Sequence, residues 1–159
     1  MLGFLDRRKE TPRLGTLRQM ALFSTLSRSE LRVVDGLLHD RTFLKDEVVF
    51  DQGEEGQALH VVITGSVLIC RQGEPETGRP TQIGPGGMFG ELALLSENAP
   101  RALQARAAED CVLASLSRGD LETLLETHAV IASKILLEFT RHLGRLLVER
   151  SSWADPKTP

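Results

Sequence analysis

The segment FGELALLSENAPRA, residues 89–102, brings a glycine, a carboxylate and a guanidinium close together. Gly90 and Glu91 stand before a short apolar run, and Arg101 follows a proline and precedes Ala102. The apolar run can form one or two helical turns, and free backbone N–H groups at such a start favour an anion. The planar guanidinium of Arg101 suits bidentate contact with a phosphate.

An ionised carboxylate only accepts hydrogen bonds, so Glu91 would repel a phosphate and attract hydroxyl groups. A ligand with an anion on one side and a ribose hydroxyl on the other reconciles Glu91 with Arg101. The small side chains of Ala102 and Ala105 leave room for it. The segment therefore predicts a sugar-phosphate site. Because Arg101 would serve the ligand, its replacement is expected to leave the unliganded chain nearly as stable. The alternative is a structural ion pair between Glu91 and Arg101 in a domain without a ligand.

The flanking sequence divides into three zones. Residues 1–40 have apolar residues at helical spacing, and Ser27 with Glu30 predicts a capping box. Residues 41–116 contain short strand-like segments between glycine-bearing turns, which is typical of a sandwich or jelly-roll barrel. These segments are residues 42–50, 58–65, 66–71, 80–84, 102–109 and 111–117.

The third zone is helical again and begins with Ser117 and Asp120, which predict a second cap. One apolar stripe then continues to Leu147. A stripe of this length needs a partner. Packing on the chain's own barrel and first helix is favoured, and a homodimer seam along the C-terminal helix is compatible with it.

Composition narrows the class of protein. The chain has 159 residues, is 41% hydrophobic and carries a formal net charge of -3, which is typical of one globular domain. The acidic balance does not favour nucleic acid as a partner. Cys70 and Cys111 lie in apolar runs and are predicted to be buried free thiols. With no signal peptide and no apolar run long enough for a membrane span, the cytoplasm is the expected compartment.

No catalytic residues and no metal site are predicted. A cupin-type metal enzyme would need an H-x-H pair with a nearby carboxylate, and His60 has no such neighbour. The other histidines, His39, His128 and His142, also lack ligand spacing. The GPGG run at 84–87 is not followed by lysine, so it reads as a turn and not as a P-loop.

The stretch FGELALLSENAPRALQARA resembles the phosphate-binding cassette of cyclic nucleotide-binding domains, a family that includes catabolite-activator-type regulators of bacteria, protein kinase A regulatory subunits and cyclic-nucleotide-gated channels. The resemblance extends to VVFDQGEEGQALHVVITGSV upstream. It implies an α+β fold, in which a β-roll of about eight antiparallel strands is flanked by N-terminal helices and two C-terminal helices. The expected division is an N-terminal extension at 1–16, the cyclic nucleotide-binding domain at 17–150 and a C-terminal tail at 151–159.

The resemblance also implies roles for individual residues. Glu91 matches the residue that binds the ribose 2′-hydroxyl, and Arg101 matches the one that pairs with the cyclic phosphate. Backbone amides complete the cradle. In the family a hydroxyl residue directly after the arginine often accompanies cGMP, so Ala102 favours cAMP and leaves cGMP as the alternative. The expected binding residues are Gly90, Glu91, Leu92, Ala93, Arg101 and Ala102.

The expected function is that of a cyclic nucleotide sensor, not an enzyme, without an output domain and with no cofactor besides its ligand. Binding would move the C-terminal helix, which would act on an effector protein whose identity the sequence does not give. The alternative is an assembly module whose long helix binds partners while the ligand site is vestigial. Residues that could cover the base are Arg145, Leu146, Leu147, Arg150 and Trp153.

Overall fold

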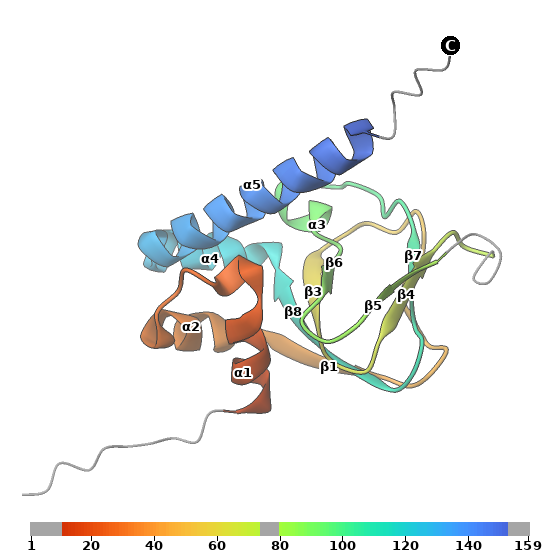
Figure 1. Cartoon of the computed structure of the whole chain (residues 1–159), viewed down its shortest axis with the longest axis horizontal. Coiled ribbons are helices and arrows are strands. Elements are labelled where there is room, and N and C mark those ends of the chain that lie inside the picture. Colours follow the sequence, from red (N-terminus) through yellow and green to blue (C-terminus); the bar gives the residue numbers. More distant parts are fainter. Residues whose placement is uncertain (1–10, 74–79, 153–159) are drawn as a thin grey trace, which may run out of the picture.

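A computed structural model of the chain describes residues 11–73 and 80–152, and its strands form two antiparallel four-stranded sheets (Figure 1). The first sheet has the order β1-β8-β3-β6 and the second the order β2-β7-β4-β5. The strands are β1 (His39–Phe43), β2 (Val48–Phe50), β3 (Ala58–Thr64), β4 (Val67–Cys70), β5 (Thr81–Ile83), β6 (Met88–Phe89), β7 (Gln104–Ala107) and β8 (Cys111–Ser117). The predicted β-roll is confirmed.

Helices precede and follow the roll, and one short helix lies within it. Both predicted capping boxes are present, at Ser27 with Glu30 and at Ser117 with Asp120. Each satisfies backbone N–H groups that the first turn of a helix leaves unpaired. The helices are α1 (Pro12–Gln19), a 3-10 turn η1 (Ala21–Phe23), α2 (Arg28–Asp35), α3 (Leu92–Leu95), α4 (Arg118–Thr127) and α5 (Ala129–Ser152).

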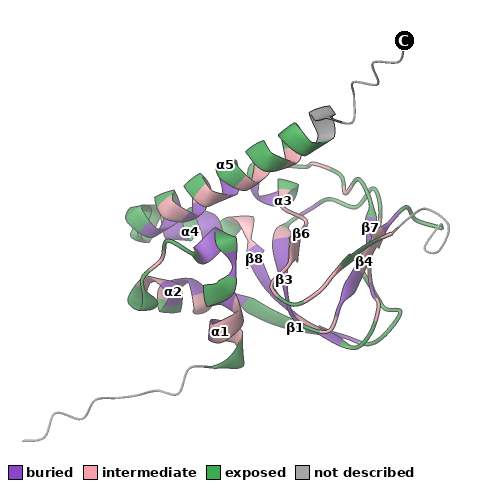
Figure 2. Cartoon of the chain, viewed as in Figure 1, coloured by how far each residue is buried: buried purple, intermediate pink, exposed green. Residues whose placement is uncertain are grey.

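Two apolar clusters hold these layers together. Figure 2 shows buried positions on the strands and on the helices beside them. One cluster lies between the two sheets and includes Val62, Val67 and Leu113. The other joins the outer face of the first sheet to the helices, and in it Leu59 and Val61 of β3 pack with Phe139 of α5. Strand β3 contributes to both clusters because successive side chains of a strand point to opposite faces.

The structure corrects two details of the predicted strands. The segment 42–50 is not one strand, because Asp46 has a φ of 70° and turns the chain between β1 and β2. Strand β6 was not predicted, since two residues are too short for a hydrophobic pattern, and it is formed by pairing with β3. Cys70 and Cys111 are buried free thiols, as predicted.

The expected outer boundaries can be compared with the ends of the helices. Helix α1 begins at Pro12, within the expected N-terminal extension, and its Leu14 is buried in the core. Helix α5 continues to Ser152, inside the expected tail. Among the helices that the structure describes, none combines the length and the hydropathy needed to cross a bilayer.

Candidate functional site

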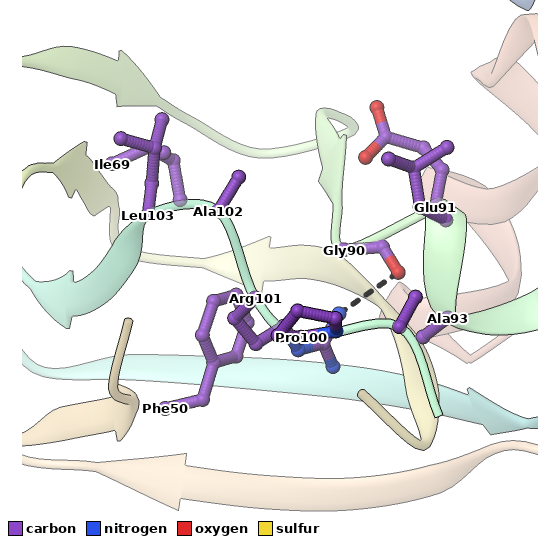
Figure 3. Close-up of a pocket in the computed structure, with 11 residues that line it drawn as sticks. Phe50, Ile69, Gly90, Glu91, Ala93, Pro100, Arg101, Ala102 and Leu103 are labelled. Carbon is purple, nitrogen blue, oxygen red and sulfur yellow. Dashed lines mark hydrogen bonds between the residues drawn. The ribbon is translucent and has the colours of Figure 1, made fainter. Parts of the chain in front are cut away.

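An open cavity of about 130 Å³ lies between α3 and the segment that leads into β7 (Figure 3). All six residues predicted to bind the ligand line it, so the structure brings them together. The remaining lining residues are Phe50, Ile69, Ala99, Pro100 and Leu103.

Arg101 is held firmly in this cavity wall. Its Nη1 donates to the Gly90 carbonyl at 3.0 Å, and its Nη2 donates to the Ala58 carbonyl at 2.9 Å. The guanidinium carbon lies 4.1 Å from the centre of the Phe50 ring, which is cation–π distance. The Nε atom is buried and has no hydrogen-bond partner among the described residues. A guanidinium has five N–H groups, so three of them remain for a ligand.

Two glycines leave the space that this guanidinium occupies. A Cβ atom on Gly90 would lie 2.7 Å from Arg101 Nη1, and one on Gly56 would lie 3.0 Å from Arg101 Cζ. Gly90 also has a φ of 78°, a conformation that side chains disfavour. Gly90 was predicted as part of the site. The role of Gly56 was not, because its sequence indicates only a turn.

The turn between β2 and β3 fixes the backbone of Arg101. The Arg101 N–H donates to the Glu54 carbonyl at 2.7 Å, and the Arg101 carbonyl accepts from the Gly53 N–H at 2.8 Å. The Gly56 N–H donates to the Ala99 carbonyl at 3.2 Å. This short ladder explains why the glycine-bearing upstream turn belongs to the same site as the cassette, although about fifty residues separate them.

The electrostatics of the site differ from those of a simple ion pair. Burial lowers the pKa of Arg101, and the carboxylates of Glu54 and Glu91 oppose that shift. Among the described residues, the basic side chain within 4.0 Å of the Glu91 carboxylate is the imidazole of His142, not the guanidinium of Arg101. The alternative of a structural ion pair between Glu91 and Arg101 is therefore not what the structure shows.

Helix α3 connects the cavity to the C-terminal helices. The amides of Ala93 and Leu94 already donate to the carbonyls of Gly90 and Glu91, at 3.2 and 3.1 Å. At the other end of α3, Arg118 donates to the Ala93 carbonyl at 2.8 Å and to the Ser96 carbonyl at 2.9 Å. Since Arg118 is the first residue of α4, it attaches the cassette to the base of the C-terminal helices.

Of the five predicted base-covering residues, the three whose side chains are described do not all lie together. Leu146 and Leu147 line a groove with Leu143, Glu91 and Leu92, next to the cavity. Arg145 is exposed and lies on another side of α5. Arg150 is within α5, but its side chain is not described, and Trp153 lies outside the described residues. Leu146 and Leu147 thus lie beside the predicted site, and Arg145 does not.

Beneath Arg101, the interior of the roll contains an unexpected histidine. His60 stacks on Phe89 with ring centres 5.2 Å apart, lies 5.8 Å from the Phe50 ring, and contacts Ser115 Oγ through Nδ1 at 2.8 Å. Burial, with the nearby charges of Arg101 and Arg41, lowers the pKa of His60 to about 4. His60 is therefore neutral near pH 7 and supports the wall on which Arg101 lies.

Sequence reasoning missed Phe50, Gly56 and His142 as parts of this region. The stacking of Phe50 under Arg101 depends on the pairing of β2 with β7, which no local pattern predicts. His142 did give a signal, as a polar residue beside Leu143 on an apolar stripe. Within residues 11–73 and 80–152, no three His, Cys, Asp or Glu side chains are grouped so that they could hold a metal ion.

The family model and the relatives that match this chain agree on one family. The model of the cyclic nucleotide-binding domain matches residues 40–128, which include the whole cavity wall. The cyclic AMP receptor protein of Thermus thermophilus is 32% identical over 125 residues, which are 77% of this chain and 56% of that protein. A cAMP-dependent protein kinase regulatory subunit of Yarrowia lipolytica is 36% identical over 104 residues, 65% of this chain and 26% of the subunit.

Solved structures agree with these relatives. The catabolite activator protein of Thermus thermophilus has a TM-score of 0.70 at 30% identity, and the match covers 84% of this chain and 63% of that one. A cyclic nucleotide-binding domain from Methylobacillus flagellatus has a TM-score of 0.75 at 24% identity, covering 93% and 83%, and shows the fold alone. The chain spans about half the length of the Thermus receptor and a quarter of the Yarrowia subunit.

Proposed function

We propose, from the premise that the chain belongs to the cyclic nucleotide-binding domain family, that it is a regulatory domain that binds cAMP in this cavity. One observation carries the proposal. Arg101 is fixed in the cavity wall by two carbonyls and an aromatic ring, yet three of its N–H groups remain unused. A buried donor without a partner is costly, and an anionic ligand would supply the missing acceptors.

The parts of a cyclic nucleotide match the chemistry of the cavity. The cyclic phosphate would accept from Arg101 and from the Leu92 amide at the start of α3, and the ribose 2′-hydroxyl would donate to Glu91. The base would lie against the apolar walls that Ile69 and Leu103 provide. Glu91 and the Ala102–Leu103 pair lie on opposite sides of the cavity in Figure 3, which leaves room for an elongated ligand between them.

The preference for cAMP over cGMP rests on Ala102, whose methyl group cannot bond the exocyclic amine of guanine. Titration calorimetry with cAMP and with cGMP tests both parts of the proposal. We expect saturable binding of both nucleotides, with cAMP tighter. If neither binds, the domain is not a receptor. If cGMP binds more tightly, the receptor function stands and the assignment of the base does not.

Regulation would use the second half of α5. The first half is anchored, because Ile135 and Phe139 are buried in the core and Lys134 Nζ contacts both carboxylate oxygens of Glu30 at 2.8 and 2.9 Å. Beyond Phe139, the helix meets the cassette through the groove that Leu143 and Leu146 line. A ligand that binds better with this half closed over the cavity would shift its position.

Gly144 lies in this second half of α5. A glycine inside a helix lowers the stability of the helix by about 1 kcal/mol relative to alanine. A Cβ at this position would meet nothing within 4 Å, so packing does not require the glycine. We infer that Gly144 lets the outer half of α5 bend when the ligand binds. An effector protein would then respond to the changed position of this half.

The alternative, an assembly module with a vestigial ligand site, has one observation in its favour. Several large apolar side chains of α5 are exposed, including Leu137 at 52% and Val148 at 70%. They could contact an effector or a second copy of the chain. Light scattering with and without cAMP separates the two functions: an oligomer indifferent to cAMP, together with no calorimetric signal, favours the assembly module.

A further inference from the structure

His142 reaches from α5 to the carboxylate that lines the cavity. Its Nε2 lies 3.6 Å from Glu91 Oε1, and the two side chains are 27% and 22% exposed. Glu91 lines both the cavity and the groove beneath α5, so it can be approached from two sides. Figure 1 shows α5 passing over α3, which begins directly after Glu91.

Among the described residues, no other basic side chain lies within 4.0 Å of this carboxylate. The terminal nitrogens of Arg101 donate to carbonyls, although its charge still acts on Glu91. On α5, Arg141 pairs with Glu138 at 2.5 Å, and Arg145 lies on a different side of the helix. Among the described side chains of α5, His142 is therefore the basic residue placed to hold the Glu91 carboxylate.

A carboxylate has two oxygen atoms and can accept from two donors at once. We propose that His142 is a positioning residue: its imidazole N–H holds one oxygen of Glu91 so that the other faces the ribose 2′-hydroxyl of the ligand. The proposal rests on the proposed function. The present separation is longer than a hydrogen bond, and contacts of this kind often tighten only when the ligand is bound.

This arrangement links the choice of ligand to the position of α5. With His142 in place, the Glu91 side chain is already ordered before the hydroxyl arrives. Without it, the ligand has to order a flexible glutamate, which loses considerable rotamer freedom. The cost falls only on a ligand that uses the carboxylate, so a nucleotide without the 2′-hydroxyl should not be affected.

The test compares the dissociation constants of cAMP and 2′-deoxy-cAMP by calorimetry in the full chain. For the wild type we expect 2′-deoxy-cAMP to bind at least about tenfold more weakly, since a hydrogen bond to a charged acceptor is lost. In His142→Ala this ratio should fall about three- to tenfold, because cAMP binds more weakly while 2′-deoxy-cAMP is unchanged. His142→Lys keeps a donor on a flexible stem and should retain most of the ratio. Val148→Ala, on an exposed position of α5, is the matched control and should change neither constant.

The outcomes separate this inference from the function on which it rests. If the wild type binds neither nucleotide, both are overturned. If it binds the two nucleotides equally, the ribose role of Glu91 is wrong, and His142 has no role through it. If the wild type discriminates and His142→Ala keeps the ratio, or weakens both nucleotides equally, only the positioning role of His142 is overturned.

Discussion

Replacing Arg101 by lysine tests whether one guanidinium stabilises the empty domain and also binds its ligand. In the structure this side chain joins the carbonyl of Gly90 to that of Ala58, and it stacks on Phe50. A lysine ammonium keeps the charge but cannot span both carbonyls or stack as a plane. The variant should therefore lose stability as well as affinity.

The magnitude follows from the contacts. Loss of one of the two charge-assisted hydrogen bonds costs about 1.5–3 kcal/mol, and loss of the stacking adds roughly 0.5–1 kcal/mol. We expect the free energy of unfolding of the unliganded chain to fall by about 2–4 kcal/mol, which for a domain of this size lowers Tm by roughly 4–16 °C. The affinity for cAMP should fall at least about tenfold, because the bidentate contact with the phosphate is lost.

The two effects are measured separately, by urea unfolding without ligand and by calorimetry with cAMP. Arg41→Lys is the matched control, since the Arg41 guanidinium lies 5.4 Å from the Phe43 ring and is exposed. It should change stability by less than about 0.5 kcal/mol. An Arg101→Lys chain as stable as the wild type would show that the carbonyl contacts contribute nothing, and unchanged cAMP affinity would refute the phosphate role.

Three further predictions concern residues around the same site. Because burial lowers the pKa of His60 to about 4 in the folded chain, from the ordinary value of about 6.5, the unfolded chain binds this proton first as the pH falls. Stability should therefore drop from pH 7 to pH 5 by about 2 kcal/mol more in the wild type than in His60→Gln, measured by urea unfolding, and parallel curves would contradict this. Gly144→Ala and the control Gly15→Ala should each stabilise the chain by up to about 1 kcal/mol. Only Gly144→Ala should reduce the cAMP-induced change in amide exchange beyond Phe139, and an equal change in all three proteins would exclude bending at Gly144. Gly56→Ala places a Cβ 2.9 Å from Ala93 Cβ; it should cost about 1–3 kcal/mol and weaken cAMP binding, and unchanged values for both would show that the guanidinium does not need this space.

The sequence predicted the parts of the fold that depend on neighbouring residues. The capping boxes and the order of cassette residues are local patterns, and all six predicted binding residues line one cavity. It did not predict the surroundings of Arg101. Phe50 and Gly56 reach the guanidinium only because β2 pairs with β7 and the following turn pairs with residues 99–101. Such pairings are formed by distant residues, and no local period indicates them.

The surroundings of Arg101 also change the role that this residue is assigned. From the sequence alone, Arg101 is predicted to contact only the ligand, so its replacement should leave the stability of the empty domain nearly unchanged. In the structure it connects β3 to Gly90, two residues before α3, with glycines on two sides and an aromatic ring below. A ligand that draws on the free N–H groups of Arg101 therefore acts on a side chain that already joins the roll to the cassette. Arg118 joins the far end of α3 to α4, and α4 leads directly into α5. These contacts form one continuous connection from the phosphate position to the C-terminal helix, which binding could bias without any residue of α5 touching the phosphate.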